Sequence, residues 1–432
     1  MNAPLRRPCV ALACSLPLLV VACGSGGASG EPTLRMQVAA DGAEVAAYEE
    51  LIEAFHDEHP EIRVELVPVA SQGDHMAKLS AEFAAGSPAD IFLVNYRRYG
   101  QLAHRGAIEP AEPLVTGDGG LDLDDFYEAP LDAFSLDGRL MCVPQNISSL
   151  VVYYNRTLFR EAGVEEPPAG GWTWTAFLET AKQMTRDLDG DGQTDVYGLA
   201  VEPSLPRLAP FVWQAGGEVV DDVDHPRQMT LLDDEAIRAI SFFIDLRREH
   251  LVAPSLEEAE AEDPEARFAR GGVAMILESR RATANLRAAE DLDFDVAPIP
   301  HDRTRANLLH SDAYCISSRT KHPEEAATFV RFALGDAGAS VLARTGRTVP
   351  SRRSIAESEA FLDPTQPPRR ARVFLDQVPL LRRLPSIATW NEIEALSEPI
   401  VEEWFYGTEP PENLGIEIDL ATRHLFSEDA GP

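Results

Sequence analysis

Cysteine is scarce in this chain: the 432 residues include only five. Three fall within the first 23 residues, which leaves Cys142 and Cys315 for the folded body. Two thiols exclude a cysteine zinc cluster or a disulfide framework. Each lies in a short apolar run typical of a strand, so we expect two buried free thiols. The alternative is one disulfide between the two cysteines, which requires that the two strands are neighbours.

Positive charge is also scarce. The sequence has 38 Lys and Arg against 71 Asp and Glu, a formal net charge of -33. Loss of Arg6 and Arg7 with an N-terminal leader would make the chain two charges more negative. Such a surface repels phosphate backbones and anionic lipid headgroups. It therefore argues against binding to nucleic acid and against electrostatic adhesion to a membrane.

Sequence motifs of catalysis are missing as well. The chain has no Gly-x-Ser-x-Gly elbow, no His-Glu-x-x-His helix and no phosphate-binding glycine loop. The acid pairs Asp124-Asp125 and Asp221-Asp222 could be read as a glycosidase dyad. Among 71 acidic residues such pairs are expected by chance. We predict no enzymatic activity, and the alternative to test is an anchored extracytoplasmic polysaccharide hydrolase.

The N-terminus carries an export signal. Arg6 and Arg7 precede an apolar stretch, residues 10–22, that is too short to span a bilayer, so residues 1–22 are predicted to be a signal peptide. The following Cys23 completes a Val-Val-Ala-Cys sequence that resembles a bacterial lipobox, whose cysteine receives a diacylglycerol. Two or more acyl chains give durable anchoring. We expect an extracytoplasmic protein held on the cell membrane by a lipidated tether, residues 23–32.

The remaining chain, about 400 residues, is too long for one core and suits two lobes. Strand-like and helix-like patterns alternate from Thr33 onward, which predicts α/β lobes with mostly parallel sheets. Short β-like crossings between lobes are expected near Val143–Ile147 and Phe294–Pro298. Helices are expected at residues 45–56, 74–85, 99–105, 157–162, 175–184, 233–249, 264–269, 324–334, 337–344 and 392–405.

Short motifs in a fixed order run along nearly the whole mature chain. They are Ala54-Phe55 with His59 to Val64, Ala89 to Phe92, Val152 to Asn155 with Leu158-Phe159 and Ala162-Gly163, Trp174 to Phe177, Ala215 to Gly217, Phe268 with Gly271 to Met275, Val296 to Pro298, Tyr314 to Ser317 with His322-Pro323 and Phe329, and Val349-Pro350. In this order the chain resembles the extracellular solute-binding proteins of bacterial ABC importers, a family whose members mostly carry sugars.

The resemblance implies a two-lobe, periplasmic-binding-protein-like (type II) α/β fold with a ligand cleft between lobes that close on a hinge. Lobe 1 is assigned residues 33–144 and 299–348, and lobe 2 residues 145–298 and 349–432. The implied function is capture of a sugar or sugar-like solute and its delivery to the permease subunits of an ABC transporter. A cleft between lobes is a usual place for a small-molecule site.

Candidate ligand-binding residues follow strand ends, where such lobes bind ligands. Planar aromatic rings can stack on a sugar ring, while amides and carboxylates orient its hydroxyls. For each tryptophan a place in the apolar core is the open alternative. The candidates are Asp41 and Glu44 after the first strand, Asn95, Tyr96 and Arg97 after the strand at residues 90–94, Gln145 and Asn146 in the first crossing, Ser311 and Asp312 beside His310, and Trp213, Trp390 and Asn391 from the other lobe.

One segment departs from the family pattern. Where members often place small residues and then an aromatic, this chain reads Glu278-Ser279-Arg280-Arg281. Two guanidiniums in a cleft would bind a carboxylate or phosphate through forked hydrogen bonds. One interpretation is therefore an anionic, uronate-like ligand. The alternative is a solvated arginine pair that only balances the charge of nearby glutamates.

An acidic loop resembles the front half of a calcium-binding loop. Asp187, Asp189, Asp191 and Asp195 occupy its first, third, fifth and ninth places, and Gly192 permits the turn. The twelfth place is Gly198, so the usual bidentate glutamate is missing. A structural calcium and a plain surface loop both remain open, and no cofactor is required.

Overall fold

The computed structural model describes residues 32–40, 42–117, 119–408 and 410–428. The expected signal peptide, Cys23 and Asp41 lie outside these ranges, so what was inferred for them stays a prediction. Within the described ranges no single helix is long and apolar enough to cross a membrane. One bent pair, Pro323–Leu334 with Asp336–Arg344, meets that test jointly on length and composition.

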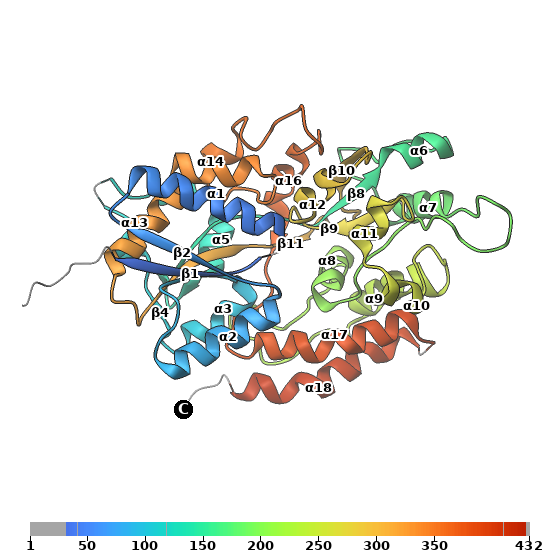
Figure 1. The fold of residues 1–432 in the computed structure, drawn as a ribbon. Coiled ribbons are helices and arrows are strands. Elements are labelled where there is room, and N and C mark those ends of the chain that lie inside the picture. Colours follow the sequence, from blue (N-terminus) through green and yellow to red (C-terminus); the bar gives the residue numbers. More distant parts are fainter. Residues whose placement is uncertain (1–31, 41, 118, 409, 429–432) are drawn as a thin grey trace, which may run out of the picture. The chain divides into compact units, whose positions relative to one another are not determined.

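The larger sheet has six strands of mixed direction (Figure 1). Its parallel part opens the chain as a β-α-β unit, as expected, with Leu34, Met36 and Val38 buried on β1. Three strands run parallel to one another: β1 (Thr33–Ala39), β2 (Arg63–Val69) and β3 (Ile91–Asn95). The strand β12 (Asp312–Ser317) runs antiparallel to each of its three partners, which are β3, β4 (Ile108–Glu109) and β7 (Cys142–Pro144).

The second sheet is antiparallel throughout. Its central strand β8 (Val151–Asn155) lies between β10 (Phe294–Pro298) and β9 (Met275–Glu278). The expectation of mostly parallel sheets is therefore wrong, because β12 returns to the larger sheet against its direction and long helical excursions separate the strands of the second. Two short pairs complete the strands: β5 (Ser135–Leu136) with β6 (Arg139–Leu140), and β11 (Asn307–Leu308) with β13 (Leu381–Arg382).

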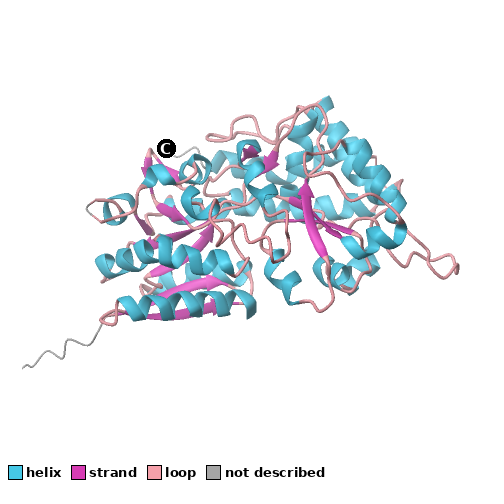
Figure 2. Cartoon of the chain, turned by 90° about the horizontal axis from the view of Figure 1, so that it is seen from above, coloured by secondary structure: helices cyan, strands magenta, loops and turns pink. Residues whose placement is uncertain are grey.

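Helices cover both sheets (Figure 2). Those packed on the larger sheet are α1 (Gly42–Glu58), α2 (Gln72–Ala85), α3 (Tyr96–Ala103), α13 (Pro323–Leu334) and α14 (Asp336–Arg344). The others are α4 (Glu112–Val115), α5 (Glu128–Ala133), α6 (Arg156–Ala162), α7 (Trp174–Met184), α8 (Leu205–Ala215), α9 (Asp234–Arg248), α10 (Leu256–Ala261), α11 (Pro264–Ala269), α12 (Ala282–Ala288), α15 (Arg353–Ala356), α16 (Arg372–Asp376), α17 (Trp390–Tyr406) and α18 (Leu414–Glu428), with 3-10 turns at Leu123–Asp125, Val378–Leu380 and Pro411–Asn413.

Helix α8 was not expected from the sequence. It is buried on nearly every side and contains Pro206 and Pro210, two residues that usually mark helix ends. Together with α7, α9 and α17 it forms the apolar core beside the second sheet, where Trp174 stacks on Phe242 at 4.4 Å between ring centroids.

Three chain segments connect the two sheets and pair with one another. Residues 145–150 lead from β7 to β8, and residues 299–311 lead from β10 to β12. The backbone of Ser148 donates to the carbonyl of His310 at 2.7 Å and accepts from its N–H at 2.9 Å. The third segment contains Pro350, which forms an antiparallel β-bridge with Asn146 of the first segment. Phe294–Pro298, expected to be a crossing, is instead a strand of the second sheet, and the crossing follows it. The lobe boundaries stay a prediction.

The two body cysteines are bonded. Cys142 and Cys315 are register partners on the neighbouring strands β7 and β12, and their sulfurs lie 2.00 Å apart. The expectation of two free thiols is therefore wrong, and the open alternative of a single disulfide describes the structure. The bond links positions 173 residues apart and holds the last strand before the first crossing to the strand after the second.

We expect the double variant Cys142→Ala with Cys315→Ala to lower the free energy of unfolding by about 2–5 kcal/mol, because the link restricts the unfolded chain. Urea denaturation followed by circular dichroism measures this, and dithiothreitol should lower the stability of the parent protein by a similar amount. Peptide mapping without reduction should recover one cross-linked peptide pair, and two unlinked peptides would contradict the bond.

Candidate functional site

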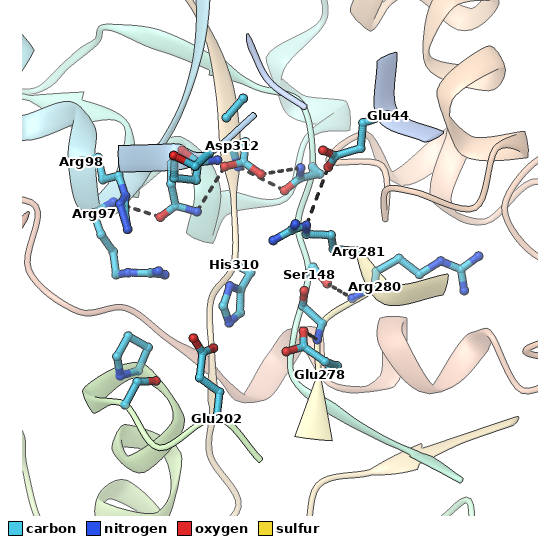
Figure 3. A pocket seen from close by; sticks show the side chains of 18 of the residues that line it. Glu44, Arg97, Arg98, Ser148, Glu202, Glu278, Arg280, Arg281, His310 and Asp312 are labelled. Atoms are coloured by element: carbon cyan, nitrogen blue, oxygen red, sulfur yellow. Dashed lines mark hydrogen bonds and ion pairs between the residues drawn. The ribbon is translucent and has the colours of Figure 1, made fainter. Parts of the chain in front are cut away.

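A cavity of about 510 Å³ lies where α3, α8 and α17 meet the ends of β3, β9 and β12. Its lining is polar and charged. Residues that belong to both sheets and to their helices bring carboxylates, guanidiniums, amides and hydroxyls to the cavity (Figure 3). None of the described residues that line it has a phenylalanine, tyrosine or tryptophan ring. A ligand here is held by hydrogen bonds and charge rather than by ring stacking.

The end of β3 places one wall. Asn95 is the last residue of the strand and also caps α3, because its Oδ1 accepts from the backbone N–H of Arg97 at 3.2 Å. The strand therefore turns into a helix with no loop between them, and the first helical turn presents Arg97 and Arg98 to the cavity. Nη1 of Arg98 lies 3.4 Å from Oδ1 of Asn391.

Helix α17 lines another wall with one stripe. Asn391, Glu394, Ala395 and Glu398 follow the i, i+3, i+4, i+7 spacing that places side chains on one helix face. Oε1 of Glu394 lies 2.7 Å from Nε of Arg97, and both side chains are 10% exposed. Burial acts to lower the pKa of Arg97, but Glu394 and Tyr96 outweigh it and the pKa is raised. Burial, with Glu202 and Glu394, raises the pKa of Glu398.

Helix α8 and strand β9 supply a second buried ion pair. Arg207 lies in the first turn of α8 and donates from Nη2 to Oε1 of Glu278, the last residue of β9. The Arg207 side chain is 8% exposed and that of Glu278 18%. Each guanidinium at this end of the cavity therefore keeps its charge beside a carboxylate.

Asp312 is held by amides rather than by an arginine. The side-chain nitrogen of Asn95 donates to its Oδ1, and that of Asn146 donates to its Oδ2, both at 3.2 Å. The backbone N–H of Asp312 in turn donates to Oδ1 of Asn146 at 3.1 Å. β3, β12 and the first crossing are thereby joined at the cavity wall (Figure 3).

His310 lies at the floor, on the second crossing. Figure 3 shows its ring between the α3 side of the cavity and the Glu278 and Arg281 side. Burial lowers the pKa of His310 well below its ordinary value, and the charges of Arg97 and Arg207 lower it further. The imidazole is therefore neutral at physiological pH.

Glu44 joins two further arginines at the rim. Its carboxylate contacts Arg347, and its Oε1 lies 3.8 Å from Nε of Arg281, which is 56% exposed. Arg347 follows a turn at Gly346, whose φ of 80° is a conformation that favours glycine. Glu44 belongs to α1 on the larger sheet, whereas Arg281 follows β9 of the second, so this contact connects the two.

Comparison with known proteins decides the family. The family model for bacterial extracellular solute-binding proteins matches residues 39–340. The chain belongs to this family. Over 405 residues it is 24% identical to a binding protein of Brucella abortus, covering 91% of this chain and 93% of that protein. It is 23% identical to the mannitol-binding protein of Pseudomonas aeruginosa, covering 82% and 80%.

The fold of this solute-binding protein is also shared. An ABC substrate-binding protein of Listeria monocytogenes, solved in complex with cycloalternan, aligns with a TM-score of 0.82 at 23% identity, covering 91% of this chain and 99% of that one. These findings confirm the expected two-lobe α/β fold and the expected family. Family membership also makes the protein extracytoplasmic and a binder of solutes.

The structure brings many of the predicted ligand residues of the solute-binding protein to one cavity. They come from six separate parts of the chain. The predicted residues that line the cavity are Glu44, Asn95, Arg97, Asn146, Ser279, Arg280, Arg281, His310, Asp312 and Asn391.

Five predicted residues lie in the interior instead. The two tryptophans are core residues: Trp390 is fully buried with its indole N–H donating to Glu394 at 2.8 Å, and Trp213 is 3% exposed on α8. Their large apolar area favours the core over a polar cleft.

The other three are polar groups already satisfied inside the protein. The hydroxyl of Tyr96 accepts from the backbone N–H of Leu384 at 3.0 Å. The amide of Gln145 donates to the hydroxyl of Tyr314 at 2.8 Å. The hydroxyl of Ser311 donates to the carbonyl of Asn146 at 2.6 Å. Each supports the cavity from behind and does not face it.

The predicted arginine pair does not act as a pair. The backbone of Arg280 lines the wall, where its N–H donates to Ser148 Oγ at 3.1 Å, but its side chain extends away from the cavity (Figure 3). Its guanidinium lies 4.8 Å from the ring of Phe361 and donates to the carbonyl of Gly346. Burial lowers its pKa to about 9. Arg281 contacts Glu44, so the two guanidiniums do not form a fork.

The acidic loop keeps its carboxylates near one another but exposed. Oxygens of Asp187, Asp189 and Asp195 lie within 4.8 Å of one another, whereas Asp191 does not join them. Backbone N–H groups of the loop donate to these oxygens, for example Gly190 and Gly192 to Asp187 at 2.7 and 2.9 Å. The structural calcium stays a prediction.

Sequence reasoning missed several cavity residues. Arg98 follows Arg97 directly and was within reach of the strand-end rule. Glu394 and Glu398 form a polar stripe on a helix that was predicted, so the stripe was a usable signal. Arg207 had none, because its helix was not recognised. The missed residues with charged side chains are Arg98, Glu202, Arg207, Glu265, Arg347, Glu394 and Glu398.

We expect Glu394→Gln to lower the free energy of unfolding by about 3–5 kcal/mol, because it leaves the buried guanidinium of Arg97 without a counter-charge. Urea denaturation measures this. The matched control is Glu403→Gln, an exposed position on the same helix, which should change stability by less than about 0.5 kcal/mol. Equal effects of the two substitutions would show that the Arg97–Glu394 pair contributes nothing specific.

Proposed function

We propose that the protein is the lipid-anchored solute-binding component of an ABC importer, which captures a polyhydroxylated, sugar-like solute in the described cavity and presents it to the permease subunits. The observation that carries this proposal is the polar cavity itself. It is lined from both sheets, at segments that connect them, so a ligand there contacts both halves of the protein.

Two relatives support the solute class. One is named for mannitol and another was solved with cycloalternan, and the latter is described as an ABC substrate-binding protein. The lining fits such ligands, because amide and carboxylate groups orient hydroxyls. Binding that favours a closed arrangement of the two halves by a few kcal/mol is enough to shift most molecules into it.

The hydrolase alternative has no observation in its favour. The acid pairs suggested from the sequence lie away from the cavity, and the carboxylates of Asp125, Asp221 and Asp222 accept hydrogen bonds within the protein. Asp125 accepts from Arg352 and Ser354, and Asp221 accepts from Arg227. The proposed function therefore includes no catalytic step, and purified protein should release no reducing sugar from polysaccharides.

The proposal is tested by thermal unfolding with single solutes. The panel contains polyols and mono-, di- and oligosaccharides, with acidic members among them. A true ligand at about 100 times its dissociation constant should stabilise the folded protein by about 2.7 kcal/mol, because it binds the native state only. Bovine serum albumin in the same buffers is the control for solute effects. Absence of a shift with every solute would refute the proposal.

The anchor is tested separately. We expect the full-length chain to partition with membranes and the Cys23→Ala variant to appear in the soluble extracytoplasmic fraction, because the lipidated residue is lost. Metabolic labelling with a fatty acid should mark the parent and not the variant. The matched control is Cys9→Ala, which changes a cysteine of the predicted leader and should leave the partition unchanged. Equal membrane association of Cys23→Ala would refute lipidation at that residue.

A further inference from the structure

Four buried nitrogen atoms at the floor of the cavity have no hydrogen-bond partner among the described residues. They are Nε and Nη1 of Arg97, Nε of Arg207 and Nε2 of His310, and of these Nε of Arg97 lies 2.7 Å from Oε1 of Glu394 as an ion pair. The two arginines are 9% and 7% exposed, so more than nine-tenths of each is buried. Buried polar groups of this kind usually find a partner, and an unsatisfied one costs free energy. All three residues line the same cavity, which makes a ligand the natural partner.

The three groups come from different parts of the fold. Arg97 lies on α3 beside the larger sheet, Arg207 lies on α8 beside the second sheet, and His310 lies on a segment between them. The guanidiniums are close enough to His310 that both charges act on its ring. A group bound at the floor therefore meets donors from both halves at once.

The chemistry of the floor selects acceptors. A guanidinium nitrogen only donates, and each of these two arginines already uses another nitrogen for its own glutamate. A ligand hydroxyl would bring a hydrogen of its own that needs an acceptor. A carboxylate or phosphate oxygen brings only lone pairs and makes charge-assisted hydrogen bonds, about twice as strong as neutral ones.

The walls suit a different part of the ligand. Asp312, Glu202 and Glu398 offer acceptor oxygens that a ligand's hydroxyls can use. The lining has no phenylalanine, tyrosine or tryptophan among the described residues, so a neutral sugar would lack a ring to stack on. The floor of the cavity therefore offers hydrogen-bond donors to a ligand, and the walls offer hydrogen-bond acceptors.

We propose that the floor formed by Arg97, Arg207 and His310 is an oxyanion subsite, and that the solute is an acidic polyol, a sugar acid or a sugar phosphate, bound with its anionic group at this floor. The inference rests on the proposed function and adds the chemical class of the ligand. It moves the anion site away from Arg280 and Arg281, because the former points away and the latter contacts Glu44.

Isothermal titration with matched ligands tests the subsite. The probes are D-glucose, D-glucuronate, D-glucose 6-phosphate, glycerol, glycerol 3-phosphate and inorganic phosphate. In at least one series the acidic member should bind about 10-fold or more tightly than its neutral counterpart, as expected for charge-assisted hydrogen bonds. The uronate and the phosphate esters distinguish the two kinds of anion.

Variants then locate the effect. Arg97→Lys and Arg207→Lys keep the charge beside each glutamate but lose the second donor edge, and His310→Ala loses the ring. Each should weaken the acidic ligand at least about 10-fold more than it weakens a neutral ligand. The matched control is Arg352→Lys, a partly buried and ion-paired arginine outside the cavity, which should change neither affinity. Thermal melts without ligand check that each variant is folded.

The outcomes separate the two proposals. If a neutral sugar binds as tightly as its acid, the subsite is refuted and the solute-binding function stands. If the variants lose acidic and neutral ligands equally, or if inorganic phosphate alone binds as tightly as the acidic polyols, the subsite for a polyol anion is refuted. If none of these six probes binds, the subsite is refuted, and the solute-binding function is decided by the broader thermal panel described above.

Discussion

The buried charges of Arg97 and Arg207 are the constraint on which the cavity depends. An arginine cannot be neutralised by losing its proton, so each of these must keep a carboxylate nearby. Glu394 meets this need for Arg97 and thereby ties α3 to α17. Glu278 meets it for Arg207 and ties α8 to β9. Replacing a buried ion pair with apolar residues of similar volume is often neutral for stability. The two pairs are therefore better explained by the ligand groups that the remaining guanidinium nitrogens can bind. In each pair a glutamate compensates the charge of the arginine, while another nitrogen of the guanidinium keeps no hydrogen-bond partner. Such an arrangement is typical of a binding site.

The paired crossings determine where those charges meet. Ser148 and His310 exchange two backbone hydrogen bonds, and Asn146 bridges to Pro350, so three segments that connect the sheets are fixed to one another. The backbone of His310 is thus fixed to the first crossing. A ligand that contacts His310 and both arginines gains most when the halves approach, which gives closure a specific cause. The disulfide between β7 and β12 keeps the larger-sheet ends of two of these segments in register.

Much of this fold could be predicted from sequence, and the limits have physical reasons. The opening β-α-β unit and helix α17 show clear periodicity, and both were predicted. Helix α8 was not, because it contains Pro206 and Pro210, and proline usually marks the end of a helix. The strand-end rule found Asn95, Asn146 and Asp312, since position along a strand is local information. It could not find that Trp213 and Trp390 are core residues or that Arg280 turns away, because side-chain direction depends on packing partners distant in the chain. The disulfide likewise required knowing which strands are neighbours.

A donor floor for anions is compatible with a chain of net charge -33. Charges on the outer surface act through water and salt, and at physiological ionic strength their effect falls off over about 8 Å. They slow the approach of an anionic solute, which lowers the association rate. Affinity is set mainly by how slowly the bound solute leaves, and that depends on contacts inside the cavity, where screening is weak. The floor has two guanidiniums that water cannot fully solvate, and the exposed acids Glu202 and Glu398 also line the cavity, where their oxygens can accept hydrogen bonds from hydroxyls. An acidic exterior with a floor of hydrogen-bond donors would therefore combine slow capture of an anionic solute with slower release.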